Sequence, residues 1–251
     1  MRQTRRHFHG RNQGFAALAV TTAIPIVALD YPDSDSAMQL VQTLDHRCRF
    51  YKVGSELFAG AGPEVVQWLR DFGCEVFLDL KFHDIPNTVA GAVRKVVSMG
   101  VRLATVHASG GSKMMRAAVE AAGDSCGILG VTILTSLDDA GLGEAWGKDR
   151  VDVENEVLRL AELTRSAGAH GIVCSGQEAM AVHSRHGEGL KLLVPGIRLE
   201  GDSAGDQSRV VTPAAAAQAG ASYIVVGRSV TASADPRKAI EAVNAQLAVA
   251  G

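Results

Sequence analysis

Short runs of apolar residues alternate with longer amphipathic stretches from Ala23 onward. This alternation is typical of parallel strands that are each followed by a helix. The apolar runs have no regular polar face, as expected for strands that are buried on both sides of a sheet. They predict eight strands, at 24–29, 50–53, 75–80, 103–107, 128–134, 171–174, 191–194 and 223–226.

Proline and glycine mark the ends of the helices between these strands. Pro63, Pro213 and Pro236 suit the first helical position, and the last two follow the N-cap residues Thr212 and Asp235. Glycines end other amphipathic segments, at Gly73, Gly100 and Gly220. Eight strand–helix units fit into residues 23–251 without a linker or a change of composition. We therefore predict a single-domain α/β fold, a (β/α)8 TIM barrel, in preference to a doubly wound sheet.

Composition narrows the classes of function. Of the 251 residues, 47% are hydrophobic and 21% are charged, which is ordinary for a packed globular domain. A net charge of −2 and an aromatic content of 5% argue against a nucleic-acid polymer as partner. The four cysteines are widely spaced and are expected to be reduced and buried, and no apolar run is long enough for a membrane span. A cytoplasmic protein without a membrane partner is the expectation.

The first 22 residues differ from the rest of the chain. They contain four arginines and no acidic residue, and an apolar run begins at Phe15. A transit peptide fits this composition better than a secretory signal, because the apolar run is short and no clear cleavage pattern follows it. We interpret residues 1–22 as a flexible N-terminal extension, with targeting as the alternative.

Charged residues gather where the predicted strands end, which is where TIM barrels place their catalytic groups. Asp79 and Lys81 are two positions apart at the end of the third strand, so both side chains should point to one face. Lys52 lies within the second strand and Asp30 closes the first. Because buried charges must be paired, we expect Lys52, Asp79, Lys81 and Asp84 to form an alternating array. Ordinary salt bridges at the barrel rim are the alternative.

A second group of residues predicts a phosphate site. The loops after strands seven and eight of TIM barrels commonly bind phosphate. Here they contain Gly196 with Arg198, and Gly227 with Arg228, so each supplies a guanidinium and a glycine that a ligand can approach closely. The stretch between them contains Gln207 and is long enough to cover a ligand as a lid. The alternative to a phosphate site is that the two arginines pair with surface acids at the barrel rim. The alternative to a lid is a plain surface loop.

Other polar residues are less specific. Thr135, after the fifth strand, suits the polar edge of a base, although such hydroxyls usually face solvent. His107 is interpreted as a packed imidazole. No histidine or cysteine spacing marks a metal site, and no Gly-x-Gly-x-x-Gly follows the first strand. We therefore expect a small-molecule substrate and neither metal nor dinucleotide cofactor.

Taken together, these residues resemble the orotidine 5′-phosphate decarboxylase family. Residues 79–88, DLKFHDIPNT, are similar to the central signature of that family, and the resemblance extends from about Ile24 to Ile240. It implies a TIM barrel that converts orotidine 5′-monophosphate (OMP) to UMP and CO2, a step of pyrimidine biosynthesis, without metal or cofactor. Only the N-terminal segment lies outside the pattern.

The resemblance also implies roles for individual residues. Lys81 supplies the proton that replaces the departing carboxylate, and Asp79 faces that carboxylate. Lys52 and Asp30 hold the ribose hydroxyls, and Thr135 contacts the pyrimidine. Arg198, Gly227 and Arg228 bind the phosphate, and Gln207 bridges the base and the phosphate.

In the family, the residues that match Asp84 and Thr88 reach into the neighbouring site of a dimer, so a homodimer with shared active sites is expected. Two rivals stay open. Magnesium-dependent sugar-phosphate decarboxylases and aldolases are similar, but an acidic residue typically stands at the position of Lys52. A catalytically silent phosphate-binding barrel would not need Lys81.

Overall fold

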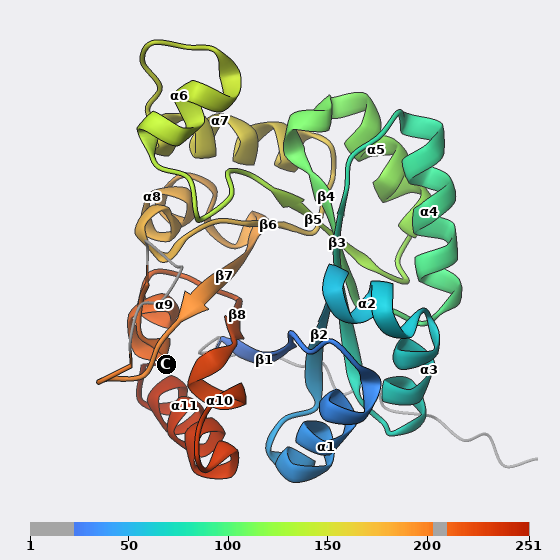
Figure 1. The fold of residues 1–251 in the computed structure, drawn as a ribbon. Helices are drawn as coiled ribbons and strands as arrows, with labels where there is room; N and C mark the ends of the chain where they lie inside the picture. The colour runs from blue at the N-terminus through green and yellow to red at the C-terminus, as the bar shows by residue number, and fades with distance from the viewer. Residues whose placement is uncertain (1–22, 203–209, 251) are drawn as a thin grey trace, which may run out of the picture.

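A computed structural model describes residues 23–202 and 210–250 of the chain. Eight parallel strands close into a barrel in sequence order, and helices surround them on the outside (Figure 1). The predicted single-domain (β/α)8 fold is confirmed. The strands are β1 (Ile24–Leu29), β2 (Phe50–Gly54), β3 (Glu75–Phe82), β4 (Leu103–His107), β5 (Gly127–Val131), β6 (Gly171–Val173), β7 (Lys191–Ile197) and β8 (Tyr223–Val226).

The helices begin and end at residues with known capping preferences. Thr212 accepts a hydrogen bond from the N–H of Ala215, as predicted for an N-cap. The glycines predicted to end helices, Gly73, Gly100 and Gly220, all have positive φ. The α-helices are α1 (Ser34–Leu44), α2 (Ser55–Ala61), α3 (Glu64–Asp71), α4 (Pro86–Ser98), α5 (Gly111–Ala122), α6 (Asp139–Trp146), α7 (Val153–Ser166), α8 (Gly176–His186), α9 (Pro213–Gln218), α10 (Arg228–Thr231) and α11 (Pro236–Ala250).

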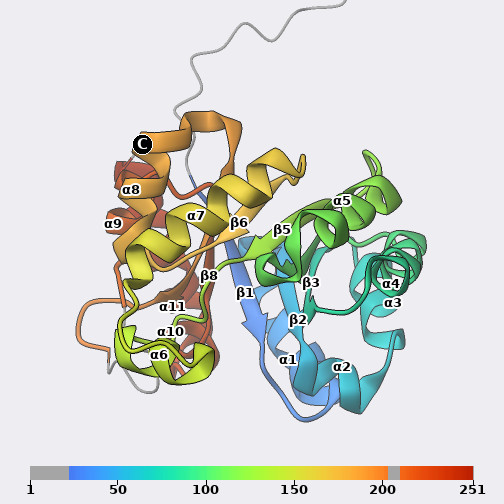
Figure 2. The same cartoon turned by 90° about the horizontal axis from the view of Figure 1, so that it is seen from above.

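The ring of helices closes where the first and last helices meet. α1 and α11 pack together beside the β1–β8 pair. In Figure 2, α8, α9 and α11 lie on one side of the strands and α3, α4 and α5 lie on the other. Arg237 on α11 donates a hydrogen bond of 2.7 Å to the carbonyl of Thr43 on α1. None of the helices within the described residues is long and apolar enough to span a bilayer.

Two apolar clusters form the core because successive strand residues point to opposite faces of the barrel. The larger one lies between the strands and the helices, and in β1 it includes Val27 and Leu29. The smaller one fills the barrel interior. Its members are Ile26, Ala28, Phe50, Phe77, Leu103, Leu129, Leu193, Tyr223 and Val225. The four cysteines are buried thiols, as predicted.

Two strands run at least two residues further than the apolar pattern predicts, and both contain an irregularity. β3 continues to Phe82, and its register with β4 shifts between Leu78 and Phe82. β7 continues to Ile197, and its register with β8 shifts at Pro195 and Gly196, where Gly196 has a φ of 77°. Bulges of this kind redirect side chains and also tolerate a proline in a central strand.

β5 is shorter than predicted. It ends at Val131, whereas the apolar pattern continues to residue 134. The hydroxyl of Thr132 donates a hydrogen bond of 2.8 Å to the carbonyl of Val173, and the N–H of Leu137 donates to Leu134 in a turn. Ile133 is buried although it lies outside the strand, so the apolar run in the sequence is longer than β5 itself.

Candidate active site

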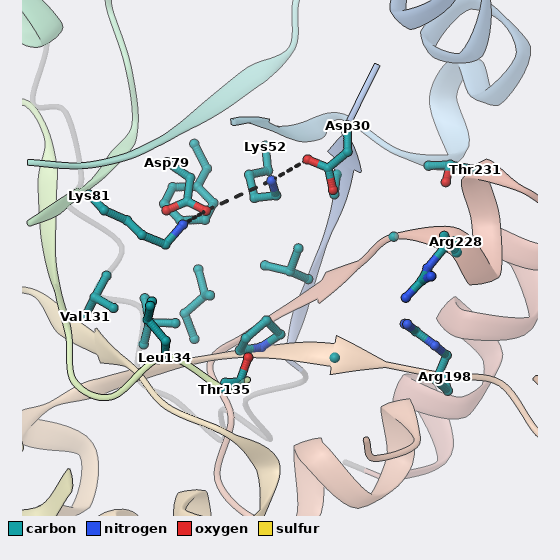
Figure 3. A pocket seen from close by; sticks show the side chains of 18 of the residues that line it. Asp30, Lys52, Asp79, Lys81, Val131, Leu134, Thr135, Arg198, Arg228 and Thr231 are labelled. Carbon is teal, nitrogen blue, oxygen red and sulfur yellow. Dashed lines mark hydrogen bonds and ion pairs between the residues drawn. The ribbon is translucent and has the colours of Figure 1, made fainter. Parts of the chain in front are cut away.

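A cavity of about 460 Å³ opens at the carboxyl ends of the strands. This volume lies within the range of about 300–1,000 Å³ that is usual for small-molecule sites. Interior core residues form its floor, namely Ala28, Phe77, Leu193 and Val225. Figure 3 shows three regions around the floor: a row of charged side chains, a largely apolar wall, and a pair of arginines at the far end.

The charged row alternates in sign. Lys52 Nζ lies 2.7 Å from Asp30 Oδ1 and 4.0 Å from Asp79 Oδ2, and Lys81 Nζ lies 2.9 Å from the same Asp79 oxygen. The side chains of Lys52 and Asp79 are only 12% and 13% exposed, whereas that of Lys81 is 37% exposed. Two ammonium groups therefore balance two carboxylates, which limits the cost of burying them.

The composition of this row differs from the predicted array in one residue. Asp30 occupies the fourth place, and Asp84 lies outside the row and does not line the cavity. The carboxylate of Asp84 instead accepts a hydrogen bond of 2.6 Å from the N–H of Ile85. Within one chain Asp84 is absent from the array because β3 ends at Phe82. Asp84 precedes α4 and Thr88 lies in its first turn, and both are exposed.

The backbone around the row is also specialised. Asp79 and Lys81 do meet, but not through simple strand alternation, because Lys81 has a φ of 50° within the β3 bulge. A Cβ on Gly54 would lie 3.0 Å from Lys52 Nζ and 3.3 Å from Asp30 Oδ1. Glycine at this position therefore leaves room for the Lys52–Asp30 ion pair.

The two predicted arginines converge at the other end of the cavity. Arg198 follows β7 and Arg228 begins α10, and Figure 3 shows their guanidinium groups pointing toward one another. Arg198 is 8% exposed, and one of its terminal nitrogens donates a hydrogen bond of 2.9 Å to the carbonyl of Ile197. Gly196 and Gly227 line the cavity beside them. Two neighbouring guanidinium groups suit a ligand with two negative charges, such as a phosphate monoester.

The remaining wall is mostly apolar. Thr135 lines it, as predicted, among side chains such as Val131, Ile133 and Leu134. Such a wall suits the face of a planar ring, and Thr135 adds a polar group to it. Gln207 lies outside the described residues.

Sequence reasoning missed the lining residue Thr231, which follows Arg228 by three positions and therefore lies about one helical turn away. That spacing was the signal that could have identified it. His107 does not line the cavity, and its ring lies 5.3 Å from that of His83. Burial, together with the neighbouring His83 and Lys81, lowers the pKa of His107. Within residues 23–202 and 210–250, no group of three or more His, Cys, Asp or Glu side chains is arranged to hold a metal ion.

Comparison with known proteins agrees with this geometry. The sequence model of the orotidine 5′-phosphate decarboxylase / HUMPS family matches residues 24–243. The orotidine 5′-phosphate decarboxylase of Alcanivorax borkumensis is 47% identical, with 89% of this chain and 97% of the relative covered. That of Halorhodospira halophila is 48% identical, with 90% and 96% covered.

Solved structures give the same result. The crystal structure of orotidine 5′-phosphate decarboxylase from Lactobacillus acidophilus has a TM-score of 0.80 and 36% identity, with 90% of this chain and 99% of that chain covered. The corresponding structure from Pyrococcus horikoshii OT3 has a TM-score of 0.72 and 26% identity over 90% and 99% of the two chains.

Proposed function

The chain belongs to the orotidine 5′-phosphate decarboxylase / HUMPS family, and on that premise we propose that it converts OMP to UMP and CO2 with Lys81 as the proton donor and without metal or cofactor. The observation that carries the proposal is the joint arrangement of the cavity. A paired lysine and aspartate lie at one end, and two converging guanidinium groups lie at the other. A phosphorylated substrate would span the space between them.

The three regions of the cavity suggest how the substrate is oriented. Arg198, Arg228 and the N–H of Gly227 bind the phosphate, and Gln207 bridges phosphate and base. Thr135 and the apolar wall hold the pyrimidine. Lys52 and Asp30 bind the ribose hydroxyls, since they lie next to each other along the charged row. This orientation brings the substrate carboxylate to Asp79 and Lys81.

The chemical step then follows from the position of Lys81. The bond between the ring carbon and the carboxylate breaks, CO2 leaves, and the electron pair stays on the ring carbon. An ammonium group beside this carbon is most stabilising when the negative charge has developed, which is the requirement for transition-state stabilisation. Lys81 Nζ then transfers a proton to the carbon and gives UMP. Asp79 holds the ammonium group in place through the 2.9 Å ion pair.

The phosphate contributes although it is remote from the reacting carbon. Binding energy from a non-reacting group can be used to hold the reacting groups in position. The two arginines are attached to β7 and β8, and the hydroxyl of Ser229 links these segments by donating to the carbonyl of Ile197 at 3.3 Å. Phosphate binding would therefore engage the ends of both β7 and β8.

A homodimer with shared sites is part of the proposal. Asp84 and Thr88 are exposed, and Ile85 between them is 67% exposed although it is apolar. Such an exposed segment, a few residues after the cavity-lining Lys81, is suited to contact with a second copy, in which Asp84 and Thr88 would complete the neighbouring site. We also propose that the protein acts in the cytoplasm, with residues 1–22 as an extension to the barrel domain.

A magnesium-dependent reaction on a sugar phosphate is the alternative within the same family. Against it stands the ammonium group of Lys52, which lies between the carboxylates of Asp30 and Asp79. This is the place where a divalent cation would bridge the two acids.

The test is the ultraviolet absorbance of OMP mixed with the purified protein in a chelator, with and without added magnesium. The proposal predicts conversion to UMP at the same rate in both. Conversion that requires magnesium would favour the sugar-phosphate branch. Binding of OMP without turnover in either would favour a silent barrel.

A further inference from the structure

Thr105 is a buried hydroxyl residue directly behind the charged row. It lies on β4, where alternate residues point into the barrel, and Leu103 two positions earlier belongs to the interior cluster. Thr105 is 0% exposed and does not line the cavity. A ligand in the cavity therefore has no direct contact with it.

The pairing of β3 with β4 explains why a hydroxyl is needed at this point. Leu78 pairs with Ala104, and Phe82 pairs with Val106. Between these two pairs, three residues of β3 (79–81) lie opposite a single residue of β4, Thr105. Lys81 is the last of these three, and its φ of 50° is unfavourable for a residue with a side chain. The N–H of Lys81 donates a hydrogen bond of 2.9 Å to Thr105 Oγ1. Thr105 thus holds the backbone of the bulge.

The same hydroxyl also fixes Asp79. Thr105 Oγ1 donates a hydrogen bond of 2.9 Å to Asp79 Oδ1. The other carboxylate oxygen, Oδ2, is 2.9 Å from Lys81 Nζ and 4.0 Å from Lys52 Nζ. Each oxygen of Asp79 therefore has its own partner, and rotation of the carboxylate would break at least one of these interactions.

We propose that Thr105 is a positioning residue for the decarboxylation. One hydroxyl connects the backbone of Lys81 to the carboxylate that holds the Lys81 ammonium group, so both ends of this lysine are set by the same atom. The inference rests on the proposed function, in which Lys81 is the acid. Loss of the hydroxyl leaves the N–H of Lys81 without this acceptor and lets Asp79 turn. A displacement of the reacting group by about 1 Å can cost about 10²-fold in rate.

The test compares Thr105→Val, which is similar in shape but has no hydroxyl, with Thr105→Ser, which keeps it. We expect Thr105→Val to lower kcat by about 10- to 100-fold and Thr105→Ser to stay within about threefold of wild type. UMP has no carboxylate to contact Asp79, so its affinity should change by less than about threefold in both variants. A role in substrate binding alone would instead change KM and UMP affinity.

The matched control is Thr164→Val on α7. Thr164 is also 0% exposed, and its hydroxyl donates to the carbonyl of Leu160, away from the cavity. This control should lose thermal stability without loss of kcat. If Thr105→Val does not fold, Thr105→Ala is compared with Thr105→Ser, since these two differ by one hydroxyl at nearly equal volume.

Three results would overturn the inference. The first is a kcat of Thr105→Val close to that of wild type. The second is a loss of kcat in Thr105→Ser as large as that in Thr105→Val. The third is a loss of UMP affinity without a loss of kcat. Each of these assumes an active wild-type enzyme. A wild-type protein that does not convert OMP would instead refute the proposed function, so the two failures are distinguishable.

Discussion

Removal of one arginine at the far end of the cavity should slow a reaction that takes place at the other end. In Arg228→Ala, the phosphate loses the hydrogen bonds of one guanidinium group. A bond to a charged group contributes about 1.5–3 kcal/mol, so two such bonds contribute about 3–6 kcal/mol. Arg198 stays in place, and water partly replaces the lost donors, so the lower part of this range applies. At about 1.4 kcal/mol per factor of ten, kcat/KM should fall by about 10²–10³-fold.

The assay measures kcat/KM for OMP and for orotidine, which has the same base and sugar but no phosphate. Arg228→Ala should be severely impaired with OMP and nearly unchanged with orotidine. Arg159→Ala is the matched control, because Arg159 pairs with Glu156 and its side chain is 57% exposed, outside the cavity. Near-normal kcat/KM with OMP in Arg228→Ala, or an equal loss with both substrates, would refute the assignment of the phosphate site.

Substitutions elsewhere test the Lys52–Asp30 ion pair, the burial of His170 and the sharing of sites between subunits. Gly54→Ala should separate Lys52 from Asp30 and lower kcat/KM by about tenfold or more. Gly189→Ala is the control and should keep the wild-type kcat/KM, because a Cβ at Gly189 would meet open space. Equal kcat/KM values in the two variants would contradict a role for Gly54 in placing the ion pair. Burial, with Arg102 and Lys191 nearby, lowers the pKa of His170 below its usual value of about 6.5. As the pH falls, His170 is therefore protonated in the unfolded chain at a higher pH than in the folded protein. This contribution to stability is present above pH ~6.5 and is lost as the pH falls below it; the decrease in melting temperature should be smaller in His170→Gln, and an unchanged decrease would refute the sign. Asp84→Ala and Lys81→Ala should each be inactive, and mixing the two should restore activity if sites are shared between subunits; no recovery after subunit exchange would contradict a shared site.

The barrel and the arginine pair could be predicted from local patterns. Strands that are buried on both faces leave continuous apolar runs in the sequence, and three strands, including β1 and β4, have the predicted bounds. Arg198 and Arg228 follow the last two strands, so their convergence needed only the closure of the barrel.

The details of the charged row could not be predicted in this way. The position of Lys81 depends on a bulge, and that bulge depends on a hydroxyl from β4, 24 residues later in the chain. The periodicity of one strand carries no information about a hydrogen-bond partner on another strand. For the same reason the sequence did not indicate that Asp30, rather than Asp84, would complete the row within one chain.

Single-turnover conversion of OMP by wild type and Lys81→Ala tests directly whether Lys81 is the acid. Lys113→Ala is the control, because Lys113 is an exposed lysine on α5 outside the cavity. Lys81→Ala should lose at least about 10²–10⁴-fold in rate, the usual contribution of a positioned acid, while its affinity for UMP changes little. A rate close to that of wild type in Lys81→Ala would show that Lys81 is not the acid.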